Sequence, residues 1–142
     1  PQTMQAAPDY GDVVAEVRAF LEARARACLA AGIARECIAI DPGFGFGKTL
    51  AHNLQLLRSL GAFAATGFPV VAGLSRKSSL GAITGRDVDE RMPASVAAAQ
   101  AAVARGAAIV RVHDVRETVD ALRVWHAVEG KGEWAPTPLR SG

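Results

Sequence analysis

Apolar residues recur along this chain in two alternating patterns, at the three- and four-residue steps of helices and in the short unbroken runs of buried strands. A first helix is expected over about 9–31, where one apolar stripe ends at Gly32 and consists of Val13, Val14, Val17, Phe20, Leu21, Cys28 and Leu29. A second helix is expected after Lys48, with an apolar face of Leu50, Leu54, Leu57 and Leu60. Further helices are expected just after Ser78, over about 90–105 and over 115–129.

Strands are predicted at 37–40, 69–74 and 108–112. They are apolar on both faces and separated by helices, so they should pair in parallel within a buried sheet of an α/β fold. Three strands cannot close a barrel, and an open sheet this narrow would leave unpaired edges. We therefore expect a fragment whose remaining strands lie elsewhere, with residues 1–129 as part of one domain and 130–142 as a loose tail.

Composition excludes several classes of function. The 142 residues are 50% hydrophobic, enough to bury a core, and 16 Lys and Arg against 14 Asp and Glu leave a net charge of +2, which argues against a nucleic-acid partner. No apolar run approaches the length of a membrane span and no signal peptide is visible, so we expect a soluble, cytoplasmic protein. Cys28 and Cys37 fit neither a metal site nor a redox pair and are interpreted as buried, reduced thiols.

Polar side chains follow each predicted strand. Asp41 opens a loop with alternating glycines (41–48), the second strand leads into 75–78, and the third leads into 111–114. The carboxyl ends of parallel strands meet at one edge of a sheet, where α/β enzymes build their sites. A phosphate-binding Walker loop is excluded, because Pro42 stands where that motif needs its first glycine.

Three segments, DPGFGFGK (41–48), GLSRKS (73–78) and RVHDV (111–115), give the chain a close resemblance to the C-terminal half of the dihydropteroate synthases, a family of pterin-binding barrels. The resemblance covers nearly everything before the tail. It implies the C-terminal part of a (βα)₈ TIM barrel of roughly 250 to 280 residues, with strands six to eight in this chain.

The resemblance also implies a reaction: 6-hydroxymethyl-7,8-dihydropterin pyrophosphate condenses with p-aminobenzoate to give 7,8-dihydropteroate and pyrophosphate, a step of folate biosynthesis. Mg²⁺ would assist, with its ligand in the missing N-terminal half and no metal ligand in this chain. The complete protein is expected to be a homodimer that sulfonamides inhibit, and the fragment alone is expected to be inactive.

Asp41 and Phe46 are the site residues expected from the glycine loop. An ionised Asp41 can accept two adjacent N–H groups of a pterin ring, as the resemblance implies; alternatively it caps its own loop. By resemblance Phe46 packs against p-aminobenzoate, whereas its alternative is a core anchor, the interpretation that suits Phe44 better. Lys48 is interpreted as a solvated residue at a helix start.

Lys77 and Ser78 begin the helix after the second strand. By resemblance Lys77 contacts both the pterin and p-aminobenzoate, and Ser78, expected as the N-cap, receives the p-aminobenzoate carboxylate. The alternative is an ordinary solvated helix start. Arg76 is left without a catalytic role, as a structural or rim residue.

Arg111 and His113 lie two apart on a strand, so they project to one face. Together they can bind pyrophosphate oxygens, and by resemblance Arg111 also flanks the pterin. Lys77, Arg111 and His113 are therefore the expected catalytic residues. A strand histidine can instead be a satisfied core or edge residue, and Asp114 is expected to cap or orient its neighbours. His52 and His126 are interpreted as surface residues.

Two other functions stay open. A pterin-binding barrel that transfers methyl groups from a reduced folate would share the role of Asp41, but the cations Lys77, Arg111 and His113 suit pyrophosphate better than a methyl donor. A non-catalytic, pterin-binding half-barrel that pairs with a partner chain is the second alternative.

Overall fold

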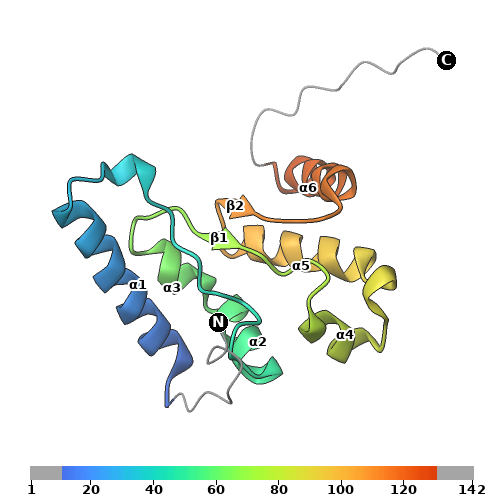
Figure 1. Cartoon of the computed structure of the whole chain (residues 1–142). Coiled ribbons are helices and arrows are strands. Elements are labelled where there is room, and N and C mark those ends of the chain that lie inside the picture. Colours follow the sequence, from blue (N-terminus) through green and yellow to red (C-terminus); the bar gives the residue numbers. More distant parts are fainter. Residues whose placement is uncertain (1–10, 131–142) are drawn as a thin grey trace.

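Helices alternate with short parallel strands in the computed structural model, which describes residues 11–130 (Figure 1). The N-terminal helical elements are α1 (Val13–Ala30), η1 (Arg35–Cys37), α2 (Leu50–Arg58) and α3 (Leu60–Ala64). They are followed by β1 (Val71–Ala72), α4 (Ser78–Thr84), η2 (Val88–Glu90), α5 (Met92–Ala104), β2 (Ile109–Val110) and α6 (Val115–Glu129). The predicted order of helices and strands is confirmed, and the predicted tail beyond residue 130 lies outside the described residues.

The strands pair in parallel, as predicted. Val71 lies opposite Ile109 in the pair formed by β1 and β2, and a single parallel bridge joins Ile40 to Val70. The predicted strand at 37–40 is thus reduced to one bridge, because Cys37 belongs to the turn η1. Cys37 is also exposed and Cys28 is only half-buried, so the prediction of buried thiols was wrong for Cys37 and holds only in part for Cys28.

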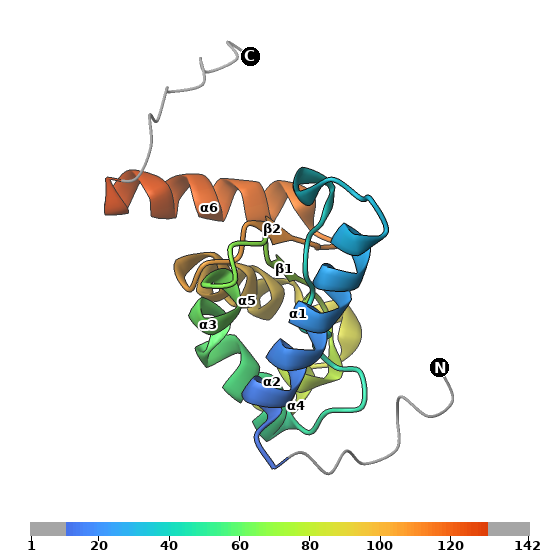
Figure 2. The same cartoon turned by 90° about the vertical axis from the view of Figure 1, so that its left-hand side faces the viewer.

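Helices cover one face of these strands. They contact one another in a row that runs from α1 through α2 and α3 to α4, α5 and α6 (Figures 1 and 2). Alternate residues of a strand face opposite sides of a sheet, so buried Val70 and Ala72 face the helices while Val71 and Ile109 face away. Ile109 is 48% exposed, so within residues 11–130 the second face of the sheet lies open.

The core lies between the strands and the helices α1 to α3. Leu56, Leu60 and Phe63 are fully buried there, against Phe44 and Val70. The predicted apolar face of the second helix is confirmed only in part: Leu60 is buried and Leu57 packs against the core, but Leu50 is exposed. Leu56 and Phe63 complete the buried face with Leu60, at helical spacing across α2 and α3. The predicted stripe of α1 is partly wrong as well, since Phe20 and Leu29 are exposed.

The remaining helices follow the sequence closely. Asp12 caps α1 by accepting hydrogen bonds from the N–H groups of Val14 and Ala15. Buried alanines let α5 pack closely, and α6 has the predicted bounds. Among the described helices none is both long and apolar enough to cross a membrane.

Candidate active site

The ends of the three strands bring together Asp41, Lys77 and Arg111. Lys77 lies close enough to the other two for their charges to act on it: Asp41 raises the pKa of its ammonium group, and Arg111 lowers it. Burial is the largest influence, and the pKa of Lys77 is lowered overall. The parallel pairing of the three segments confirms the predicted meeting of their ends at one edge, and this edge holds one carboxylate near two cations.

The glycine loop is held from inside by Lys48. Its Nζ donates to the carbonyl oxygens of Gly43 at 2.9 Å and of Phe46 at 3.1 Å. The interpretation of Lys48 as a solvated residue was wrong: the side chain is partly buried, and burial lowers its pKa while nearby Asp41 opposes that shift. Lys48 thus closes the loop by bonding two carbonyls that would otherwise need water.

Asp41 accepts a hydrogen bond from the N–H of Gly43 at 2.8 Å, so the loop-capping contact considered for it is present. The Asp41 residue is exposed at the carboxyl end of its strand. A carboxylate has about four acceptor positions, so this bond leaves capacity for a ligand. The pterin role of Asp41 stays a prediction.

Asn53 of α2 is a residue of the site that the sequence did not reveal. Its Oδ1 accepts from the N–H of Gly45 at 2.7 Å, and its Nδ2 donates to the carbonyl of Thr49 at 2.9 Å. Asn53 is buried on the same side of the helices as Leu56 and Leu60. Its spacing, three positions before Leu56 and seven before Leu60, was the available indication, but Leu56 had not been assigned to the apolar face.

Phe44 is buried and Phe46 is exposed, although they are only two residues apart. Phe44 is buried in the core, as predicted, whereas Phe46 is 53% exposed and so is not a core anchor. The ammonium of Lys77 lies 4.9 Å from the centre of the Phe46 ring, within the range of a cation–π contact, and donates to the Phe44 carbonyl. Lys77 and Phe46 therefore form one wall of the site.

Lys77 also occupies the N-cap position of α4, with an extended backbone, and Ser78 is the first helical residue. The prediction of Ser78 as the N-cap was wrong by one position, because helical backbone angles begin at residue 78. No side chain caps this helix. Ser78 is exposed, and it belongs to the first turn of α4, whose amides have no partner within the helix.

Arg111 extends the pairing of β2, since its N–H donates to the carbonyl of Ala72 at 3.0 Å. Its guanidinium lies across the backbone of Gly73, where an added Cβ would be 3.0 Å from Nη2. His113 comes two residues later, and its Nδ1 lies 2.9 Å from the Oγ of Ser75. Ser75 also accepts from the His113 backbone N–H at 3.1 Å, so one buried hydroxyl orients this histidine.

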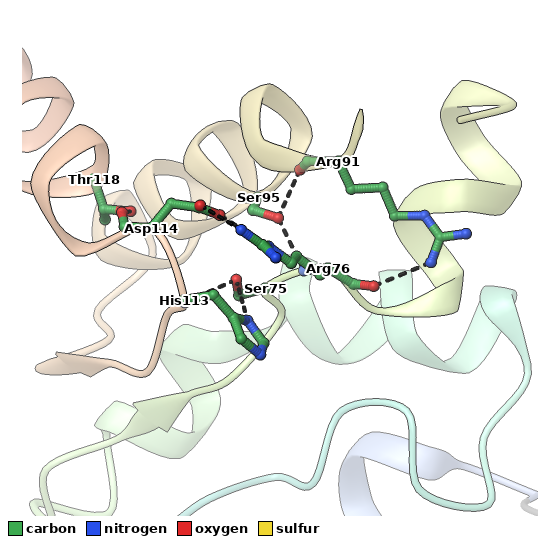
Figure 3. A network of polar contacts seen from close by, with 7 residues as sticks. All are labelled: Ser75, Arg76, Arg91, Ser95, His113, Asp114 and Thr118. Carbon is green, nitrogen blue, oxygen red and sulfur yellow. Dashed lines mark hydrogen bonds and ion pairs between the residues drawn. The ribbon is translucent and has the colours of Figure 1, made fainter. Parts of the chain in front are cut away.

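Arg76 and Asp114, which directly follow Ser75 and His113, are also paired (Figure 3). Arg76 donates from Nη2 and Nε to the two carboxylate oxygens of Asp114, at 2.6 and 3.2 Å. The hydrogen bond from Arg76 lowers the pKa of Asp114. Asp114 thus orients a neighbour, as predicted, and Arg76 is a structural residue, as interpreted.

Within residues 11–130 no three His, Cys, Asp or Glu side chains gather as a metal site would require. Two histidines lie on helices. The Nδ1 of His52 accepts from the N–H of Thr49 at the start of α2, and the ring of His126 lies 4.9 Å from that of Trp125 in α6.

A model of the family described as pterin binding enzyme matches residues 1–113. The chain is 57% identical over 132 residues to the dihydropteroate synthase of Neisseria meningitidis serogroup B, covering 90% of this chain and 46% of that protein. The chain spans about half the length of the curated relatives it matches.

Solved structures agree. A crystal structure of the dihydropteroate synthase of Stenotrophomonas maltophilia is similar with a TM-score of 0.87 and 58% identity, covering 92% of this chain and 49% of the other. That of Xanthomonas albilineans with 4-aminobenzoic acid gives 0.85 and 55%, covering 87% and 45%. The Yersinia pestis enzyme in a sulfonamide drug complex gives 0.86 and 42%, covering 92% and 47%.

Proposed function

This chain belongs to the family of pterin binding enzymes, and on that premise we propose that it supplies part of the active site of a dihydropteroate synthase. The reaction joins 6-hydroxymethyl-7,8-dihydropterin pyrophosphate to p-aminobenzoate. The observation that carries the proposal is the meeting of Asp41, Lys77 and Arg111 at the ends of three parallel strands. A carboxylate that can bind the pterin and cations that can bind a diphosphate then lie at the same edge of the sheet.

Each residue has a chemical part in this proposal. Asp41 accepts N–H groups of the pterin edge, while p-aminobenzoate packs its ring against Phe46, with Lys77 at its edge and its carboxylate at Ser78. Lys77 also contacts the pterin. The structure supports this placement through the exposed ring of Phe46 and the ammonium of Lys77 over it.

Arg111 and His113 bind the diphosphate. The bond between the pterin methylene carbon and the diphosphate oxygen breaks with its electron pair leaving on that oxygen, and the arylamine nitrogen forms the new C–N bond and loses a proton. An arylamine is a weak nucleophile, so stabilising the charge on the departing diphosphate matters most. Arg111 also flanks the pterin ring, where its planar guanidinium can stack.

Mg²⁺ would add positive charge at the diphosphate. The described side chains do not provide a ligand cluster for it. Its protein ligand would lie outside this chain. The cations of Lys77 and Arg111 are the groups of this chain that balance the diphosphate charge.

The three strands would be strands six, seven and eight of a (βα)₈ barrel. The open face that holds Ile109 would then line the barrel interior, and its exposed apolar surface is the support for this assignment. The chain without the other strands would lack half the site and be inactive.

A cytoplasmic homodimer is the proposed state of the complete protein. An apolar cavity of about 300 Å³ lies between α2, α4 and α5, lined by residues that include Leu54, Leu57 and Ile83. A second copy covering this side would bury Ile83, which is exposed. Sedimentation of the full-length protein distinguishes dimer from monomer.

The test is an assay for dihydropteroate and pyrophosphate from both substrates. It uses this chain in its full-length protein, or joined to the N-terminal part of the Neisseria meningitidis relative that the chain does not cover. Equimolar formation of both products is expected, with competition between sulfonamide and p-aminobenzoate. Methyl transfer from a reduced folate without pyrophosphate release would favour the methyltransferase, and tight pterin binding without turnover would favour the non-catalytic half-barrel.

A further inference from the structure

We propose that Arg76 is a positioning residue for condensation: it sets the conformation of the loop 75–78 and acts through Lys77 and Ser78. This role deepens the proposed function and rests on it. Arg76 immediately precedes Lys77, and its guanidinium is directed to Asp114 rather than to the strand-end cluster (Figure 3).

The backbone of Arg76 is the first observation. Its φ is 57°, and among residues 11–130 it is the only non-glycine residue with positive φ. Side chains with a Cβ disfavour this left-handed region, so a residue stays there only where its surroundings hold it. The chain turns at this point from the end of a strand into the start of α4.

The helix α5 holds both polar groups of the Arg76 backbone. The N–H of Arg76 donates to the Oγ of Ser95 at 2.9 Å, and that hydroxyl donates to the carbonyl of Arg91 at 2.7 Å. Nη1 of Arg91 in turn donates to the carbonyl of Arg76 at 3.1 Å (Figure 3). Ser95 is only 1% exposed, so its hydroxyl is a fixed acceptor. The strained backbone of Arg76 is thus bonded through both its N–H and its carbonyl.

The side chain of Arg76 joins this loop to the loop after β2. Its two-point bond to Asp114 lies next to the bonds between Ser75 and His113. Ser75 and Arg76 of one loop thus bond to His113 and Asp114 of the other, respectively. The distance from Lys77 to His113 is thereby set by four hydrogen bonds that involve no ligand.

A partly exposed ion pair contributes little to folding, and the side chains of Arg76 and Asp114 are 34% and 14% exposed. Its consequence is expected in the placement of Lys77 and Ser78, since small displacements of positioned groups cost rate far more than stability. The binding of p-aminobenzoate at this loop should therefore suffer more than the binding of the pterin at Asp41.

Arg76→Gly is the decisive variant, because glycine accepts a φ of 57° without strain while the bond to Asp114 is lost. Its melting temperature should stay near that of the parent protein. We expect the KM for p-aminobenzoate to rise about tenfold and kcat to fall about tenfold or more. The dissociation constant of the pterin pyrophosphate should change less than about threefold, and Arg76→Lys should recover part of the loss.

Asp114→Asn is the second variant. It keeps the shape of the acceptor and weakens the charge-assisted bond, so it should show the same contrast between the two substrates even if Arg76→Gly folds poorly. Arg18→Ala is the matched control, since it removes an ion pair of 2.9 Å between Arg18 and Glu22 on α1. Its kinetic constants should equal those of the parent.

The parent protein is assayed first. A parent that folds and forms no dihydropteroate overturns the proposed function and this role with it. With an active parent, the positioning role is overturned if both variants keep parental kinetics, or if both lose pterin affinity as strongly as they lose p-aminobenzoate affinity.

Discussion

The ammonium group of Lys77 lies over the ring of Phe46, 4.9 Å from its centre, and bonds the carbonyl of Phe44 in the same loop. Lys77 and Phe44, 33 residues apart in the sequence, are thereby joined at the mouth of the proposed site. An added Cβ at Gly45 would lie 3.1 Å from Cδ of Lys77, so the glycine also makes room for this side chain. Lys77 is thus the residue on which the glycine loop and the loop 75–78 converge.

Lys77→Ala should lower kcat by at least about 100-fold, because it removes the cation from the reacting groups. Global stability should change little, since the side chain lies at a strand end outside the apolar core. Steady-state kinetics and a thermal unfolding curve check both parts. Parental turnover in this variant would refute the assignment of Lys77 as catalytic.

The charge of Lys77 gives a test in pH. Its pKa is lowered, so in the folded protein the ammonium deprotonates below 10.5, the ordinary lysine value, and steps that need the cation fail in that window. Because the unfolded state binds this proton more tightly, the same group makes folding stability increase with pH there. The Nζ titration of Lys77, followed by NMR, measures the shift directly.

Neighbouring charges should move that titration in opposite directions. Asp41→Asn removes a charge that raises the pKa of Lys77, so it should lower that pKa further, whereas Lys48→Met removes a like charge and should raise it. Equal titrations in both variants would show that the three groups are not neighbours.

Arg111 and Gly73 should act as a pair. Arg111→Ala removes a diphosphate contact and should weaken the pterin pyrophosphate by about 10-fold or more, with p-aminobenzoate less affected. Gly73→Ala places a methyl group 3.0 Å from the Arg111 guanidinium. It should displace the guanidinium and weaken binding of the pterin pyrophosphate by less than Arg111→Ala does. Calorimetry on each substrate measures both.

Gly61→Ala is the matched glycine control. It lies within α3, and its added Cβ would meet only the carbonyl of Arg105 at 3.9 Å. Alanine should stabilise the helix by about 0.5–1 kcal/mol without changing ligand affinity. Unchanged diphosphate affinity in both Arg111→Ala and Gly73→Ala would contradict the anion role.

Asn53→Ala should cost about 1–3 kcal/mol of folding stability, because it leaves the N–H of Gly45 without its buried partner. The freed glycine loop should also raise the KM of both substrates. Chemical denaturation and kinetics check this, with exposed Gln55→Ala on the same helix as control. A fully stable Asn53→Ala variant would mean that another group satisfies the loop.

Much of the fold could be predicted, because local periodicity reports helices directly. The bounds of α6 and the parallel pairing of β1 and β2 were predicted correctly. Errors arose in the helix after Lys48, where Leu56 and Phe63 join Leu60 in the buried face while Leu50 is exposed. The chain offers two faces with helical spacing there, and only the packing against the core selects between them.

By itself the sequence determined the alternation of strands and helices and the polar residues at the strand ends, since apolar spacing and residue chemistry are local properties. Only the tertiary structure decided which of those residues are held by which neighbours. Asn53 and Gly45 are eight residues apart, while Arg76 and Asp114 are 38 apart. Hydrogen bonds over such separations depend on how helices and loops pack, so spacing along the chain does not reveal them.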